Sequence, residues 1–265
     1  MSVKKEANGR RSISVEVVVP GTPEEVWDAI ATGPGISKWF VPAQVEPHVG
    51  GKMVLNFGPG MDSESEVTAW DAPHRFSATG QGLGPGAPDM ATEWTVEARA
   101  GGTCTVRVVH SLFADTDEWD NQLGEVESGW PSFFVVLRMY LSHHRGQPGA
   151  HFQVMAPVPG TAIDGWRALM GRLGLRSLAA GTKIQSHAGT APLAGIVETV
   201  GPESHPNQVI VRLDEPAGAA MLSTCAMGEH TYFVGSFYFF GPKATEGLKA
   251  EKEWQDWLGK SAAAS

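Results

Sequence analysis

Histidine is the residue type in this sequence best suited to acid–base chemistry near neutral pH, and one histidine stands in an apolar setting. His110 lies beside Val109 and Leu112 in a strand-like segment. An imidazole in such a place could orient a bound ligand or move a proton. A histidine in a strand is more often only hydrogen-bonded. His110 is therefore a candidate binding residue, and the catalytic residues stay unassigned.

The spacing of the other reactive side chains does not indicate a metal site or a catalytic site. His143 and His144 are adjacent, so they point to different faces, and no carboxylate or cysteine stands at ligand spacing. Cys225 and His230 are close in sequence, but no third group is placed to orient them as a nucleophile and base. HEXXH, GxSxG and Walker patterns do not occur. We expect neither a metal nor another cofactor.

Aromatic residues recur in a way that suits the wall of an apolar pocket. Such side chains supply a large contact area for a small apolar molecule, and ordinary core packing is the alternative for each of them. The candidate ligand-binding residues are Trp39, Phe40, Trp70, Trp94, His110, Phe113, Trp130, Phe133, Phe134 and Leu137. Glu93 and Arg107 stand on predicted strands and are expected to face outward. The glycine-rich run from Thr79 to Met90 is expected to be a loop between strands and a candidate lid.

The first elements that must position these residues can be predicted from periodicity and capping. Valines alternate with Ser and Glu from Ser12 to Val19, which predicts a half-buried strand. Thr22 is a good N-cap, and the Pro and two Glu residues after it suit the first turn of a helix. Gly33-Pro34-Gly35 is expected to end that helix, and a second short helix is expected to hold Trp39 and Phe40.

The rest of the first half predicts a sheet followed by a long helix. Short strand-like runs separated by turns extend from about Gln44 to Phe113, which is typical of an antiparallel meander. Between Trp130 and Leu141 large apolar residues recur at three- and four-residue steps, which predicts one apolar face on a long helix. A sheet that curls around such a helix buries both, and it leaves a cavity where side chains do not fill the space.

The second half repeats the first in the same order. Ser14–Ile30 matches Gln153–Leu169 without a gap. Further along, Gly51, Val67 and Trp130 align with Gly181, Val197 and Trp254 in turn. The RGQPG segment has the Gly and Pro content of a linker. We therefore predict two domains, residues 1–148 and 149–265.

Several strings in the first copy resemble a known family. PEEVWDAIATGPGISKWFVP, VGGKMVLNFG, EVTAWDAPHRFSAT and SGWPSFFVVLRMYL occur in this order. Together they resemble the SRPBCC (START-like) superfamily, specifically the branch named after the carboxy-terminal domain of the Hsp90 ATPase activator. The resemblance spans nearly all of residues 12–142 and is much weaker over residues 152–260.

The resemblance implies an α+β helix-grip fold, in which a curved antiparallel sheet wraps around a long carboxy-terminal helix. Together with the internal repeat, it indicates two tandem copies, the second diverged and shortened. Members of the superfamily bind lipids, sterols, polyketides and hormones, and some are cyclases or other enzymes. They share no common set of catalytic residues, so none is carried over to this chain.

Composition limits the partners of the chain. Lys and Arg number 20 against 29 Asp and Glu, and the formal net charge of -9 argues against a nucleic-acid partner. No apolar run approaches the roughly 20 residues that cross a bilayer, and the basic amino terminus is not followed by a signal-peptide pattern. We expect a cytoplasmic location. Cys104 and Cys225 are far apart in apolar stretches and are expected to be buried thiols.

These observations favour binding of an apolar small molecule of the lipid, polyketide or hormone type in an internal cavity, without catalysis. Two alternatives stay open: a cyclase or dehydratase that uses the same cavity, and a protein-interaction module of the chaperone-cofactor kind. A homodimer or another protein partner also stays open. Replacing His110 by Ala would separate binding from catalysis, because an enzyme that relies on it would lose turnover and keep its ligand affinity.

Overall fold

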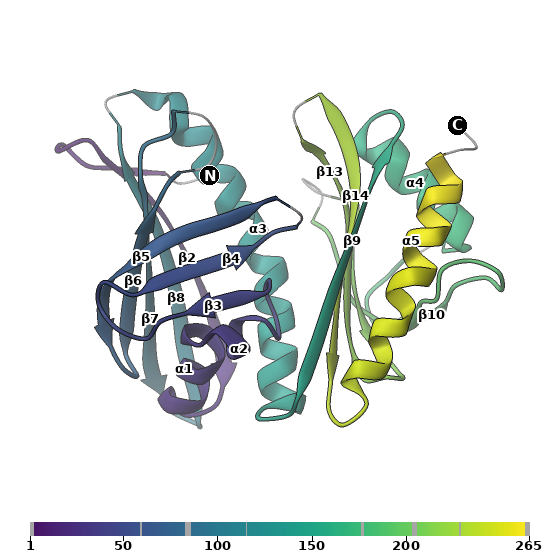
Figure 1. Ribbon diagram of the computed structural model, residues 1–265, viewed down its shortest axis with the longest axis horizontal. Coiled ribbons are helices and arrows are strands. Elements are labelled where there is room, and N and C mark those ends of the chain that lie inside the picture. The colour runs from purple at the N-terminus through teal and green to yellow at the C-terminus, as the bar shows by residue number, and fades with distance from the viewer. Residues whose placement is uncertain are drawn as a thin grey trace. The chain divides into compact units, whose positions relative to one another are not determined.

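The chain folds into two compact units, Met1–Arg145 and Gly146–Ser265. Their structure is a computed structural model that describes residues 3–58, 60–82, 86–114, 116–175, 178–202, 206–227 and 229–262. Each unit contains one antiparallel sheet with helices packed on it (Figure 1). The division falls at the RGQPG segment. The two units are described one at a time below.

The first unit is an eight-stranded antiparallel sheet with one long helix and two short ones. In chain order its elements are β1 (Lys4–Lys5), β2 (Arg10–Pro20), α1 (Pro23–Ala31), α2 (Gly33–Ile36), β3 (Ala43–Val45), β4 (Lys52–Asn56), β5 (Asp62–Asp71), β6 (Arg75–Gly80), β7 (Met90–Arg99), β8 (Thr103–Phe113), the 3-10 turn η1 (Asp117–Trp119), α3 (Asp120–Met139) and the π-helical turn η2 (Tyr140–His144). The strands lie in the order β1-β2-β8-β7-β6-β5-β4-β3. The predicted meander is confirmed, with β2 paired along its whole length to β8.

Capping side chains fix the two short helices. Thr22 accepts the Glu25 N–H while the Glu25 carboxylate accepts the Thr22 N–H, so α1 begins where the sequence predicts it. The next helix differs from the prediction. Gly33-Pro34-Gly35 forms α2 itself, because Thr32 caps it through the Gly35 N–H and a proline needs no donor in a first turn.

The predicted second helix therefore ends before Trp39 and Phe40. The Ser37 hydroxyl donates to the Gly33 carbonyl at 2.8 Å and accepts the Ala43 N–H at 2.9 Å. These two bonds turn the chain away from the helix. The two aromatic residues consequently lie in the turn between α2 and β3, both buried.

The long helix α3 begins well before Trp130, and Pro131 lies inside it. Its first turn is held to the edge of the sheet by charge. Asp120 Oδ1 lies 2.6 Å from the Arg11 guanidinium, and Asp120 Oδ2 lies 2.7 Å from the Lys5 ammonium. One turn later Leu123 packs with Ile13 of β2 in a small apolar cluster, so the helix lies along the sheet (Figure 1).

The second unit has a six-stranded sheet in the order β10-β11-β12-β13-β14-β9. In chain order its elements are β9 (Gly149–Val158), α4 (Ala162–Leu173), β10 (Lys183–Gln185), β11 (Ala194–Val200), β12 (Gln208–Leu213), β13 (Gly218–Met227), β14 (His230–Phe240), the 3-10 turn η3 (Ala244–Leu248) and α5 (Lys249–Ala262). Helices α4 and α5 cover one face of the sheet (Figure 1), and Trp166 and Trp254 contribute to the core beneath them.

Local details of the first unit recur in the second. The pairing of β5 shifts register between Val67 and Ala69, and that of β11 shifts between Val197 and Thr199. In both units a glycine with positive φ donates its N–H at 2.8 Å to the valine that precedes the bulge. These glycines are Gly50 and Gly181. The predicted tandem helix-grip fold, with a shorter second copy, is confirmed.

The two cysteines differ in exposure. Cys104 is fully buried and its thiol donates to the Gly21 carbonyl at 3.3 Å. In the second unit Thr231 occupies the equivalent place, with its hydroxyl 2.9 Å from the Gly160 carbonyl. Cys225 on β13 is only partly buried, so the expectation of a buried thiol holds for Cys104 alone.

Candidate ligand-binding cavity

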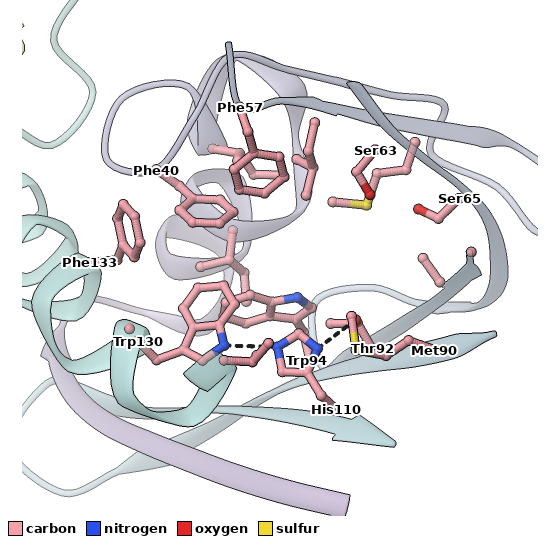
Figure 2. A pocket seen from close by; sticks show the side chains of 18 of the residues that line it. Phe40, Phe57, Ser63, Ser65, Met90, Thr92, Trp94, His110, Trp130 and Phe133 are labelled. Atoms are coloured by element: carbon pink, nitrogen blue, oxygen red, sulfur yellow. Dashed lines mark hydrogen bonds between the residues drawn. The ribbon is translucent and has the colours of Figure 1, made fainter. Parts of the chain in front are cut away.

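An apolar cavity of about 400 Å³ lies in the first unit between α3 and the sheet. Its lining comes from α1, α2, the turn after α2, strands β4 to β8 and α3 (Figure 2). The cavity thus occupies the space that the helix-grip arrangement leaves between its helix and its sheet. Two short helices close one side, because the capping bonds described above direct Trp39 and Phe40 inward.

Aromatic rings in mutual contact form one wall of the cavity. The ring of Phe40 lies 4.6 Å from that of Phe133 and 5.0 Å from that of Trp130, measured between centroids. Trp94 meets Trp130 edge-on at 5.1 Å. The indole N–H of Trp39 is satisfied away from the cavity, since it donates to the Ala29 carbonyl at 2.9 Å. The wall therefore presents ring faces and edges to the interior.

The residues proposed from the sequence separate into two groups. Those that line the cavity are Trp39, Phe40, Trp94, His110, Trp130 and Phe133. Four others lie elsewhere. Trp70 packs against Trp27 at 5.2 Å, Phe113 is 62% exposed at the end of β8, and Phe134 and Leu137 are buried on α3 outside the cavity lining.

Residues of α1, of β4 and the turn after it, and of β6 and β7 that the sequence does not single out complete the lining. They include Ile30, Met53, Leu55, Phe57, Ala78 and Thr92. Strand alternation could have found several of them, because successive side chains point to opposite faces of a sheet. Met53 and Leu55 share one face of β4, and Thr92 shares a face of β7 with Trp94.

Three side chains form a hydrogen-bonded series at one end of the cavity. Trp130 Nε1 lies 2.8 Å from His110 Nε2, and Thr92 Oγ1 lies 2.9 Å from His110 Nδ1 (Figure 2). Thr92 and His110 are direct partners across β7 and β8, so the sheet register brings them together. The imidazole and indole planes are nearly parallel, at 18° and 5.5 Å between centroids.

The protonation state of His110 follows from these partners. Burial lowers its pKa to about 4, so the ring is neutral near pH 7. An indole N–H can only donate, so Nε2 must be the acceptor and the ring proton must reside on Nδ1. Nδ1 therefore donates to the Thr92 hydroxyl. Both ring nitrogens are engaged.

More exposed polar groups line another part of the cavity. They are Ser63 and Ser65 on β5, Gln81 after β6 and Glu125 on α3. In Figure 2 the two serines lie on the far side of the cavity from Phe133. The cavity is thus apolar along its walls, with the partly buried hydroxyl of Thr92 beside the buried His110 and a more polar rim.

The second unit replaces the polar series with apolar residues. The position of His110, which pairs with Ile13 and Thr92, corresponds to Phe237, which pairs with Phe152 and Ala220. Trp254 stands where Trp130 stands in the first unit, and its indole donates to the Pro192 carbonyl instead.

The space between α5 and its sheet is filled by aromatic rings. The ring of Trp254 lies 5.0 Å from that of Phe237 and 5.9 Å from that of Phe233, and Trp254 itself is fully buried. An open groove of this unit runs instead along α4, where Trp166 and Val200 are among the residues that line it.

The remaining candidates from the sequence lie apart from the cavity. Glu93 pairs with Arg75, and Arg107 pairs with Glu16, in exposed ion pairs that confirm their outward orientation. His143 is exposed in η2. Cys225 faces Tyr232 across the β13–β14 pair, whereas His230 faces Met227. The centre of the glycine-rich run, residues 83–85, lies outside the described residues.

Two further features concern the whole of the described chain. Its described segments contain no cluster of three or more His, Cys, Asp or Glu side chains arranged to hold a metal ion. Within the same segments no helix is both long and apolar enough to cross a membrane.

Comparison with known proteins finds a family model similar to the first unit and solved structures with low similarity to the chain. BexL, a di-domain ARO/CYC from the BE-7585A biosynthetic pathway, is 14% identical over 96% of this chain and 95% of its own, with a TM-score of 0.45. DynU16, from the dynemicin biosynthetic locus, is 18% identical over 85% and 86%, with a TM-score of 0.45. CalU16 from Micromonospora echinospora is 21% identical over 49% and 74%, with a TM-score of 0.42.

A search of curated proteins found no match. Residues 20–142 match the family model described as "Activator of Hsp90 ATPase homolog 1-like protein". This match spans most of the unit that carries the cavity and its Trp130–His110–Thr92 series, so the first unit is similar to the Activator of Hsp90 ATPase homolog 1-like family.

Proposed function

We propose that the first unit binds an apolar small molecule in the cavity between α3 and the sheet, and that it does so without catalysing a reaction. The cavity itself carries this proposal. Protein interiors are packed about as densely as organic crystals and rarely contain large voids. A space of about 400 Å³ falls within the range of small-molecule sites. Its aromatic and aliphatic lining favours a guest of the lipid, polyketide or hormone type.

The state of His110 supports binding rather than proton transfer. A general base must offer a free nitrogen within hydrogen-bond reach of the proton it removes. In His110 one nitrogen accepts from Trp130 and the other donates to Thr92. A pKa of about 4 also makes the imidazole a weak base. The buried histidine therefore serves to hold its neighbours in place.

A glycine on α3 allows the proposal to be tested without disturbing the core. Gly129 lines the cavity, and a Cβ built there meets no atom within 4 Å. The Gly129→Phe substitution would project a ring into this open space, and it would also relieve the cost of glycine inside a helix. Gly259 on α5 is the matched control, because a Cβ there is equally free and the position is exposed.

The experiment measures binding of the apolar dye Nile red by its fluorescence. We expect Gly129→Phe to weaken binding by about tenfold or more, because the ring occupies the space of the guest. Gly259→Phe is expected to leave binding unchanged. Equal affinities of the wild-type protein and the Gly129→Phe variant, with both folded by circular dichroism, would refute the proposal.

A further inference from the structure

We infer that the ligand of the first unit carries a hydrogen-bond acceptor, such as a ketone oxygen, which accepts the hydroxyl proton of Thr92. This inference rests on the proposed function, since it concerns the same cavity. It assigns the polar recognition element of an otherwise apolar site. Three successive hydrogen bonds, from Trp130 through His110 and Thr92 to the guest, each have a direction that the chemistry of the donors fixes.

The first two directions are fixed by Trp130. Its indole N–H has no acceptor capacity, so His110 Nε2 accepts at 2.8 Å. A neutral imidazole then carries its one proton on Nδ1, which lies 2.9 Å from Thr92 Oγ1. The hydroxyl oxygen of Thr92 is therefore an acceptor in this bond.

The hydroxyl proton of Thr92 is not used in the bond with His110. A hydroxyl group donates one hydrogen bond, and the bond from His110 does not use the Thr92 proton. Across the described segments, the hydroxyl of Thr92 makes no hydrogen bond other than the one to His110. Thr92 lines the cavity, so its proton is available to a guest (Figure 2). An acceptor atom on the guest is the group that this proton requires.

The surroundings of Thr92 make such a bond selective. Its neighbours in the lining include Trp94, Met90 and Ala78, which offer apolar side chains. A donor that loses water in an apolar cavity without gaining a partner costs free energy. Bonds in series also polarise one another, which strengthens the last donor. A guest with a suitably placed acceptor is therefore favoured over the same skeleton without it.

The second unit shows that the fold does not require this series. The same strand register there places Ala220 beside Phe237, and Trp254 donates to a backbone carbonyl. Ala220, Phe237 and Trp254 thus pack the helix on the sheet without a hydrogen bond between their side chains. The polar trio of the first unit is therefore available for recognition and is not a condition of folding.

The test compares two tricyclic probes that differ in one acceptor, fluorenone and fluorene, as competitors of Nile red. In the wild-type protein we expect fluorenone to bind about three- to tenfold more tightly, the worth of one neutral hydrogen bond. Thr92→Val removes the hydroxyl and keeps the branched shape. It should abolish this advantage of fluorenone over fluorene, whereas Thr92→Ser should retain it.

A second measurement does not depend on any variant. The infrared carbonyl stretch of isotope-labelled fluorenone bound to the wild-type protein should lie at lower frequency than in an alkane solvent, because hydrogen bonding weakens the C=O bond. An unshifted band, equal affinities for the two probes, or equal losses for both in Thr92→Val would each overturn the inference. These results do not test the proposed function. That proposal is tested separately, by the binding of Nile red to the Gly129→Phe variant.

Discussion

The indole of Trp130 on α3 lies almost parallel to the imidazole of His110 on β8, and its Nε1 is 2.8 Å from the His110 Nε2. This contact joins the long helix to the sheet by a buried hydrogen bond as well as by packing. It also fixes which ring nitrogen carries the proton. Replacing the donor should therefore change both the stability of the unit and the tautomer of the histidine.

In Trp130→Phe the aromatic contact is partly kept but the N–H is lost. We expect the free energy of unfolding to fall by about 1–3 kcal/mol beyond the loss of apolar area, because His110 Nε2 is left buried without a donor. Urea unfolding measures this term, and the nitrogen chemical shifts of the imidazole report the tautomer.

The control for this change is Trp27→Phe. Trp27 is similarly buried and packs against Trp70 and Phe76, yet its indole makes no hydrogen bond among the described residues. A loss no larger at Trp130 than at Trp27, together with an unchanged Nδ1–H tautomer, would contradict the prediction.

The stability of the protein should fall in mildly acidic solution because of two buried histidines. Burial lowers the pKa of His110 and that of His151 on β9 to about 4, from an ordinary value of 6.5. Below pH 6.5 these two imidazoles bind protons in the unfolded chain but not in the folded chain. The free energy of unfolding therefore decreases as the pH falls from 6.5 to about 4. Above pH 6.5 this contribution is fully present.

His110→Gln isolates one of the two contributions. Between about pH 7 and about pH 4.5 we expect the variant to lose about 2–3 kcal/mol less stability than the wild-type protein, because one titrating group is removed. Urea unfolding at the two pH values measures the difference. His48→Gln, at an exposed position, is the control. An identical pH dependence in His110→Gln would show that the buried imidazole titrates normally.

Gly35 positions the aromatic turn that closes the cavity. A Cβ at this position would lie 1.9 Å from the Asp28 carbonyl oxygen, so α1 and α2 would have to move apart. We expect Gly35→Ala to lower the free energy of unfolding by about 1–3 kcal/mol and to weaken Nile red binding. Gly171→Ala on α4, where a Cβ meets nothing within 4 Å, should instead be neutral or stabilising. Thermal melts of the two variants test this contrast.

Much of the fold could be predicted from local patterns. The valine alternation of β2 and the Thr22 cap of α1 are signals within a few residues, and the structure confirms both. The order of the repeated motifs predicted the tandem fold. The helix predicted for Trp39 and Phe40 is wrong, because the bonds of Ser37 to Gly33 and Ala43, which turn the chain, leave no pattern in the sequence.

The polar part of the site was harder to predict. Residue type alone indicates His110, but only the register of β7 and β8 places Thr92 beside it. The bond from Trp130 depends on the rotation of α3 over the sheet, which a hydrophobic stripe does not specify to within one residue. Phe113 is an aromatic residue predicted to line the pocket, but it faces solvent because it lies at the end of its strand.

The register shift shared by β5 and β11 affects the open groove along α4 of the second unit. An extra residue in a strand inverts the in-and-out sequence of the side chains that follow. In the first unit this inversion turns Trp70 beneath α1 and against Trp27. In the second unit the residue at that step is the smaller Val200, which lines the groove along α4 together with Trp166. The two scaffolds thus differ at this step of the strand in the size of one side chain.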